Sequence, residues 1–196
     1  MASGFPWLTA LIVLPLVGAA VVWALPSSAR THVRLVALGF ALAELLLGVG
    51  ALLAFDTADS ATHQLTEVQS WIPAFGVSYA VGVDGVGLSL VLLSVLLVPL
   101  VVLAAWREQG GDTGRLRHYL ALVLVLETFM VAVFAARDVF LFYVLFEAML
   151  IPVYFMIGAF GGAHRRYAAV KFLLFSLAGG LIMLVGVIAL YLQGPG

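Results

Sequence analysis

The sequence of 196 residues contains no cysteine and only 10% charged residues. Without cysteine the chain cannot form disulfides, thiolate metal sites or cysteine-held iron–sulfur clusters. Its formal net charge of -1 provides no basic patch of the kind that nucleic acid requires. Hydrophobic residues make up 64% of the chain and the mean hydropathy is +1.19, a composition suited to a lipid environment. We therefore expect an integral membrane protein.

Six apolar segments are long enough to cross a bilayer, which takes about 20 mostly apolar residues per helix. We place these spans at about residues 6–25, 33–54, 83–105, 117–136, 138–158 and 169–192. The first has no Lys or Arg before it and is longer than the usual ~7 to 15 apolar residues of a secretory signal, so we treat it as a permanent span. The predicted fold class is all-α, a polytopic membrane protein with about six transmembrane helices.

The distribution of positive charge predicts how these spans are oriented. Alternate connections hold eight of the nine basic residues, namely Arg30, Arg34, Arg107, Arg115, Arg117, Arg165, Arg166 and Lys171. The remaining connections hold only Arg137. By the positive-inside rule the eight face the cytoplasm, so both chain ends, including the N-terminus, lie on the outer face. The long acidic connection over residues 56–79 then lies outside, and Asp84 in the glycine-rich GVDGVGL that follows is expected to cap a helix start.

One ionisable residue, Glu147, stands in the middle of the apolar run VFLFYVLFEAMLIPVYFMIGAF, residues 139–160. At 1.5 Å per residue it lies roughly 14 Å beyond Asp138, close to half of a ~30 Å hydrocarbon core. A charged side chain at that depth costs about 2.5 to 3.5 kcal/mol and usually marks an ion or proton path. We therefore expect function around Glu147.

Two further glutamates fall at a similar depth. Glu127 follows Arg117 by ten residues and Glu44 follows Arg34 by ten residues, roughly 15 Å in each case. Three unpaired carboxylates would cost roughly 8 to 10 kcal/mol, so they must be neutral or have partners. Since desolvation favours a neutral carboxyl and a nearby cation favours a carboxylate, a moving positive charge could load and unload such groups, as a proton relay requires. For Glu44 alone, a neighbouring helix hydroxyl is an equal alternative.

Other residues around these acids leave two interpretations open. Pro152 frees the carbonyl of Ala148, next to Glu147, which either holds water or simply accompanies a helix kink. Tyr143 lies one turn before Glu147, on the same face, and either hydrogen-bonds it or is simply an aromatic side chain in lipid. Lys171 is the only lysine. It either extends to the membrane interface or, because a lysine adjusts its protonation far more readily than an arginine, carries protons.

Two segments resemble a known family. The stretch RDVFLFYVLFEAMLIPVYFMIGAFGGAHRRYAAVKFLLFSLAGGLIML, residues 137–184, looks like the signature of subunit M (chain 4) of the proton-pumping NADH:quinone oxidoreductase, respiratory complex I. The motif WIPAFGVSYAVGVDGVGLSL, residues 71–90, is similar to the same family. The combination of FYVLFEAMLIP, GG, RRYAAVKF and LAGG favours subunit M over the related subunits L and N. The resemblance covers nearly the whole chain.

The resemblance implies roles for three residues. Glu147 matches a fifth-helix glutamate that is thought to pair with a seventh-helix lysine, which would lie beyond Gly196. Glu127 matches a fourth-helix acid that has an auxiliary role. Lys171 falls in the KF motif at the start of helix six, where we expect the cytoplasmic proton entry. Phe146 replaces the tryptophan often found before the glutamate, a minor departure. Family members have fourteen helices built from inverted repeats that contain broken helices.

The resemblance also implies how such a chain works. We expect a subunit of an NADH:quinone oxidoreductase in the bacterial plasma membrane that moves protons and has no redox centre. NADH, FMN, iron–sulfur clusters and quinone are expected on other subunits, and no metal on this chain. The expected partners are the other complex I membrane subunits, especially the L- and N-type antiporter-like subunits, together with membrane lipid.

Two alternatives come from other functional classes. A cation/proton antiporter subunit of the Mrp type shares the helical unit and the buried glutamate. A purely structural membrane scaffold predicts that Glu147 tolerates leucine. A haem protein or an intramembrane hydrolase is disfavoured, because the histidines fall in connections or at span ends, at positions 32, 63, 118 and 164.

Overall fold

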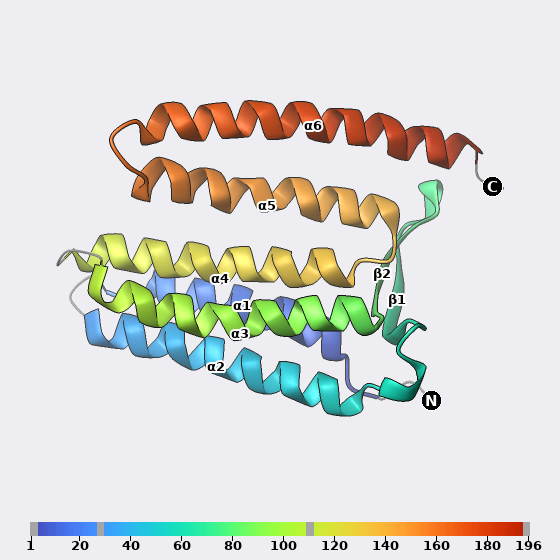
Figure 1. The fold of residues 1–196 in the computed structure, drawn as a ribbon, viewed down its shortest axis with the longest axis horizontal. Coiled ribbons are helices and arrows are strands. Elements are labelled where there is room, and N and C mark those ends of the chain that lie inside the picture. Colours follow the sequence, from blue (N-terminus) through green and yellow to red (C-terminus); the bar gives the residue numbers. More distant parts are fainter. Residues whose placement is uncertain (1–3, 27–29, 109–111, 194–196) are drawn as a thin grey trace.

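The computed structural model describes residues 4–26, 30–108 and 112–193. They form six long helices and one two-stranded sheet (Figure 1). The helices are α1 (Trp7–Ala24), α2 (Arg30–Ala54), α3 (Gly85–Glu108), α4 (Thr113–Ala135), α5 (Val139–Phe160) and α6 (Arg165–Gln193). All six are long and apolar enough to cross a membrane. The predicted all-α class with six spans is confirmed.

Aspartates fix where three of the helices begin. The Asp84 carboxylate accepts a hydrogen bond from the backbone N–H of Gly87 at 2.7 Å, which confirms the predicted cap of α3. Asp112 and Asp138 cap α4 and α5 in the same way. Helices α4 and α6 begin at residues 113 and 165 instead of the expected 117 and 169. Counting apolar residues predicts only the part of each helix that lies in lipid, whereas the helical hydrogen bonding continues into the polar residues on either side.

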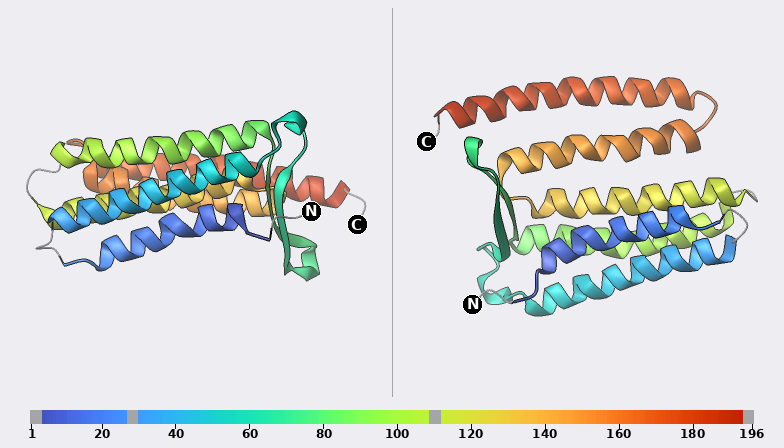
Figure 2. Two further views of the ribbon diagram at one scale, coloured as in Figure 1. Left: turned by 90° about the horizontal axis from the view of Figure 1, so that it is seen from below. Right: turned by 180° about the vertical axis from the view of Figure 1, so that it is seen from behind.

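The first four helices form a bundle, and the last two extend it sideways. Helix α1 packs against α2 and α4, and α3 packs against α2 and α4. Helix α5 lies on α4, and α6 lies on α5 at the edge of the molecule (Figures 1 and 2). Helix α4 is the most buried of the six and α6 the least. The outer face of α6 is therefore left to lipid or to neighbouring helices.

The long connection between α2 and α3 folds into a hairpin of β1 (Gln64–Ile72) and β2 (Val77–Val83). It lies at the end of the bundle where α3 and α5 begin (Figure 1). The Glu67 carboxylate on β1 accepts a hydrogen bond from the backbone N–H of Leu8 at 2.9 Å and another from the Thr9 hydroxyl. Because Leu8 and Thr9 belong to the first turn of α1, the hairpin holds that helix start in place.

Candidate functional site

The buried core of the bundle consists of two apolar clusters. The first includes Ala41 of α2 and Leu124 of α4, and the second includes Ala51 of α2 and Val131 of α4, nearer the hairpin. Along both helices a glutamate falls between the two clusters. Among the residues that the structure describes, the buried polar ones are Glu44, Ser94, Glu127 and Thr128. We call these four residues the polar layer.

Glu44 on α2 and Glu127 on α4 face one another in the polar layer. Both side chains are 0% exposed, and their carboxyl groups lie close enough to interact. Each continues the buried stripe of its helix, three residues after Ala41 and Leu124 respectively. None of their four carboxyl oxygens has a hydrogen-bond partner within the described part of the chain. The structure thus joins two acids that the sequence placed only at a common depth.

Two arginines, one on α2 and one on α4, bind backbone carbonyls at the predicted cytoplasmic end of the bundle. The Arg34 guanidinium donates to the carbonyl of Trp106, and Arg117 donates to the carbonyl of Leu25 at 2.7 Å. Helices α2 and α4 both start at this end, so they run in the same direction (Figure 1). Equal distances of ten residues from each arginine therefore bring the two glutamates to the same level.

The hydroxyl groups of the polar layer do not supply donors to the acids. Ser94 donates to the carbonyl of Leu90 at 2.9 Å, and Thr128 donates to the carbonyl of Leu124 at 3.3 Å. Both are bonds to the preceding turn of the same helix, which use up the hydroxyl proton. The alternative in which Glu44 faces a hydroxyl of a neighbouring helix is therefore not observed among the described residues, and its polar neighbour is Glu127.

Glu147 lies elsewhere, in the interface between α5 and α6. Gly180 of α6 is buried, and a Cβ atom added there would overlap the Glu147 carboxyl group. The Glu147 side chain is half-buried, and its Oε1 atom is buried without a hydrogen-bond partner among the described residues. Sequence reasoning named the LAGG segment only as part of a motif. The feature of the sequence that could have indicated this position is the glycine itself, because a small residue in a membrane helix permits the close approach of a neighbouring helix.

The remaining predicted neighbours do not surround Glu147. No hydrogen bond joins it to Tyr143, although the structure describes both side chains. Pro152 is buried, and α5 continues through it to Phe160. Its proposed role in hydration stays a prediction.

Lys171 lies on the outer face of α6. Its Nζ atom is 5.9 Å from the ring centres of both Tyr167 and Phe175, and the side chain is exposed. It precedes Gly180 by nine residues, which is about 14 Å along the helix and half a turn around it. Lys171 therefore points away from α5 and does not approach Glu147. Its role in proton entry stays a prediction.

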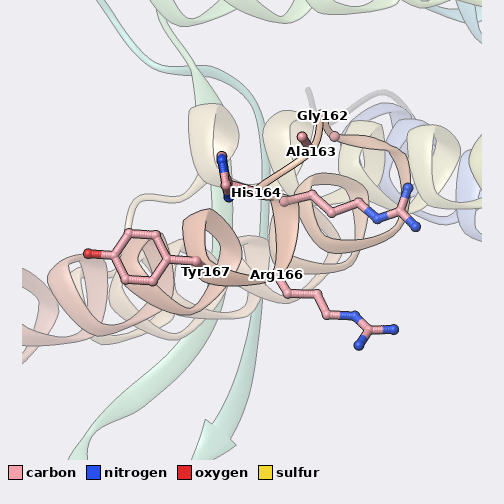
Figure 3. A pocket seen from close by; sticks show the side chains of 7 residues that line it. Gly162, Ala163, His164, Arg166 and Tyr167 are labelled. Carbon is pink, nitrogen blue, oxygen red and sulfur yellow. The ribbon is translucent and has the colours of Figure 1, made fainter.

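The connection between α5 and α6 carries an open hollow of about 720 Å³. Figure 3 shows His164, Arg166 and Tyr167 around it, with their side chains pointing in different directions. No set of donors converges on one point there. We interpret this region as the polar end of a helix pair and not as a ligand site.

Comparison with known proteins shows which family these helices match. The family described as NADH-ubiquinone oxidoreductase chain 4, amino terminus, matches residues 58–133. The family described as NADH:quinone oxidoreductase/Mrp antiporter, TM, matches residues 136–194. Glu127 lies in the first match, and Glu147 and Lys171 lie in the second.

Two curated relatives are similar over almost the whole chain. NADH-quinone oxidoreductase subunit M of Mycobacterium tuberculosis (strain ATCC 25618 / H37Rv) is 43% identical over 217 residues, covering 96% of this chain and 39% of the relative. NAD(P)H-quinone oxidoreductase chain 4-3 of Nostoc sp. (strain PCC 7120) is 42% identical over 194 residues, covering 99% and 34%. The chain thus spans less than half the length of these relatives.

Two solved structures share the fold. Respiratory complex I from Thermus thermophilus with bound NADH matches with a TM-score of 0.77 and 32% identity, over 92% of this chain and 35% of the matched chain. The Mrp complex from Dietzia sp. DQ12-45-1b matches with a TM-score of 0.79 and 24% identity, over 95% of this chain and 19% of the matched chain. The second likeness concerns the fold alone.

Proposed function

Because the chain belongs to the subunit M (chain 4) family of NADH:quinone oxidoreductases, we propose that it is a membrane subunit contributing to redox-coupled proton translocation. The observation that carries this proposal is the position of Glu147. Its carboxyl group lies between α5 and α6, roughly 14 Å along α5 from Asp138, in the segment that matches the family. The chain is an integral membrane protein with six spans.

In this proposal Glu147 is the group that takes up and releases the proton. Its Oε1 atom has no hydrogen-bond partner in the described segments, so in this proposal the cation that drives the proton transfer comes from outside them. Lys171 does not serve as that cation, since it faces away from α5. The resemblance implies a lysine on a seventh helix instead.

Glu127 and Lys171 have supporting roles in the proposal. Glu127 is fully buried in the polar layer and acts as an assisting acid. Lys171 follows Arg165 and Arg166 at the predicted cytoplasmic end, where it forms part of the proton entry. A lysine can release its proton far more readily than an arginine, which suits this position.

The finer assignments of partner and location belong to the same proposal. NADH, FMN, iron–sulfur clusters and quinone bind to other subunits, and the L- and N-type antiporter-like subunits are the neighbours in the membrane. The absence of cysteine supports placing the clusters elsewhere. We place the chain in the bacterial plasma membrane, and the distribution of basic residues favours an N-terminus on the outer face.

The test is Glu147→Gln in the complete complex, with Tyr143→Phe as the matched control on the same helix. The Gln side chain keeps the shape of Glu but cannot release a proton. We expect the variant to assemble and to pump fewer protons per NADH oxidised, whereas the control keeps the wild-type ratio. An unchanged ratio in a normally assembled Glu147→Gln complex would refute the proposal.

The alternative is a subunit of an Mrp-type cation/proton antiporter. The description of the family that matches residues 136–194 names the Mrp antiporter as well, but the two curated relatives described above are a subunit M and a chain 4 protein. Purification of the native complex separates the two. Co-purifying NADH-oxidising subunits favour the first reading, and a complex without them favours the antiporter.

A further inference from the structure

The polar layer contains two acids apart from Glu147, and the mechanism proposed above uses only one of them, Glu127, in an assisting role. Glu44 and Glu127 are enclosed between the two apolar clusters, with both side chains fully buried and all four oxygens without a donor among the described residues. Their carboxyl groups lie within interaction range of one another. Two charged carboxylates in that position would repel each other at low dielectric.

No neighbouring element supplies a compensating cation in the described residues. Helix α1 has no titratable residue, and the charged residues of α3 are its last two, at positions 107 and 108. On α5 the titratable side chains are Tyr143, Glu147 and Tyr154, and the Glu147 carboxyl turns toward Gly180. Tyr79 of β2 hydrogen-bonds Thr9 at 2.8 Å. On α2 and α4 the basic residues lie at the ends, about 15 Å away.

We propose that Glu44 and Glu127 hold at least one proton between them and so form a second proton-binding site, separate from Glu147. With one proton in place, the protonated carboxyl donates to the other, which removes the repulsion and satisfies two of the four oxygens. The proton belongs to the pair and not to either residue. This inference rests on the assisting role proposed above for Glu127 and names Glu44 as its partner.

Infrared spectroscopy of the intact complex tests this pair directly. The C=O stretch of a protonated carboxyl is separate from the carboxylate bands, and its shift in D2O identifies an exchangeable proton. Spectra are recorded over a pH titration for wild type, Glu44→Gln and Glu127→Gln. The matched control is Ser94→Ala, which changes a buried side chain of the same layer that is not an acid.

The expected result is that Glu44→Gln and Glu127→Gln each shift the frequency of the same protonated-carboxyl band, because the remaining acid stays buried beside a different partner, while Ser94→Ala leaves that band in place. Shifts of two different bands in the two variants, or a shift of no band in either, would overturn the proposal. If Glu44→Gln fails to assemble, Glu44→Asp replaces it, because the shorter side chain keeps the carboxyl but must change the frequency of a shared band. An unchanged frequency then counts against the pair.

The same spectra distinguish this inference from the proposed function. Glu147→Gln should leave the band of the pair in place whether or not proton pumping is lost. If Glu147→Gln pumps normally, the proposed function fails and the result for the pair still stands. If Glu147→Gln abolishes pumping but no shared band exists, the pair alone is refuted.

Discussion

Gly180 of α6 leaves the space that the carboxyl group of Glu147 on α5 occupies. A glycine here lets the two helices approach while an acid lies between them, because no side chain projects from α6 at that level. The position of the candidate proton carrier therefore depends on a residue that carries no chemistry itself.

Replacing Gly180 with alanine should move Glu147 and weaken the contact between α5 and α6. Overpacking of this kind costs about 1 to 3 kcal/mol. We expect a lower Tm of the purified complex and fewer protons pumped per NADH. Gly179→Ala is the matched control, since a Cβ atom there meets nothing within 4 Å. Equal behaviour of the two variants would contradict the packing described for Glu147.

The two acids of the polar layer should show strong non-additivity when they are replaced by leucine. Removing one acid leaves the other buried without a partner, which costs about 1 to 3 kcal/mol, whereas removing both leaves an apolar layer. We therefore expect Glu44→Leu and Glu127→Leu each to lower the Tm of the complex more than the double variant does. Losses that simply add would mean that the two side chains do not interact.

The helices could be predicted from the sequence because their apolar runs are long and uninterrupted. The hairpin formed by β1 and β2 could not, because its paired strands are held by contacts with distant segments. The carbonyl of Ala80 accepts a hydrogen bond from the backbone N–H of Arg137 at 2.8 Å, and Glu67 binds the first turn of α1. Such partners are separated by many residues, so local patterning does not reveal them.

Part of the candidate site could likewise be predicted from the sequence, and part could not. The depth of Glu44, Glu127 and Glu147 follows from counting residues along straight helices, and that much was predictable. Which helix face meets which neighbour depends on packing, so neither the pairing of Glu44 with Glu127 nor the place of Gly180 could be predicted. The outward direction of Lys171 likewise became clear only when Gly180 fixed the face of α6 that contacts α5.

Glu67 should be important for the start of α1 even though it is far from the polar layer. Its carboxylate accepts hydrogen bonds from the backbone N–H groups of Leu8 and Thr9 at 2.9 and 3.3 Å. Glu67→Ala should cost about 0.5 to 2 kcal/mol, as for other helix caps, and lower the Tm of the complex. Glu67→Gln keeps an acceptor and should lose less. A smaller loss in the alanine variant than in the glutamine variant would contradict this role.

Lys171 provides a test of proton entry that does not disturb packing. Its side chain is exposed beside Tyr167 and Phe175, and Lys171→Arg keeps the positive charge and its contacts with both rings. An arginine does not release its proton in proteins, so a lysine that carries protons cannot be replaced by it. We expect Lys171→Arg to assemble with an unchanged Tm and to slow proton uptake from the cytoplasmic side, measured with a pH-sensitive dye in inverted vesicles. The reverse exchange at the neighbouring site, Arg166→Lys, is the control and should leave uptake unchanged. If Lys171→Arg pumps at the wild-type rate, Lys171 only positions the end of α6 at the membrane interface.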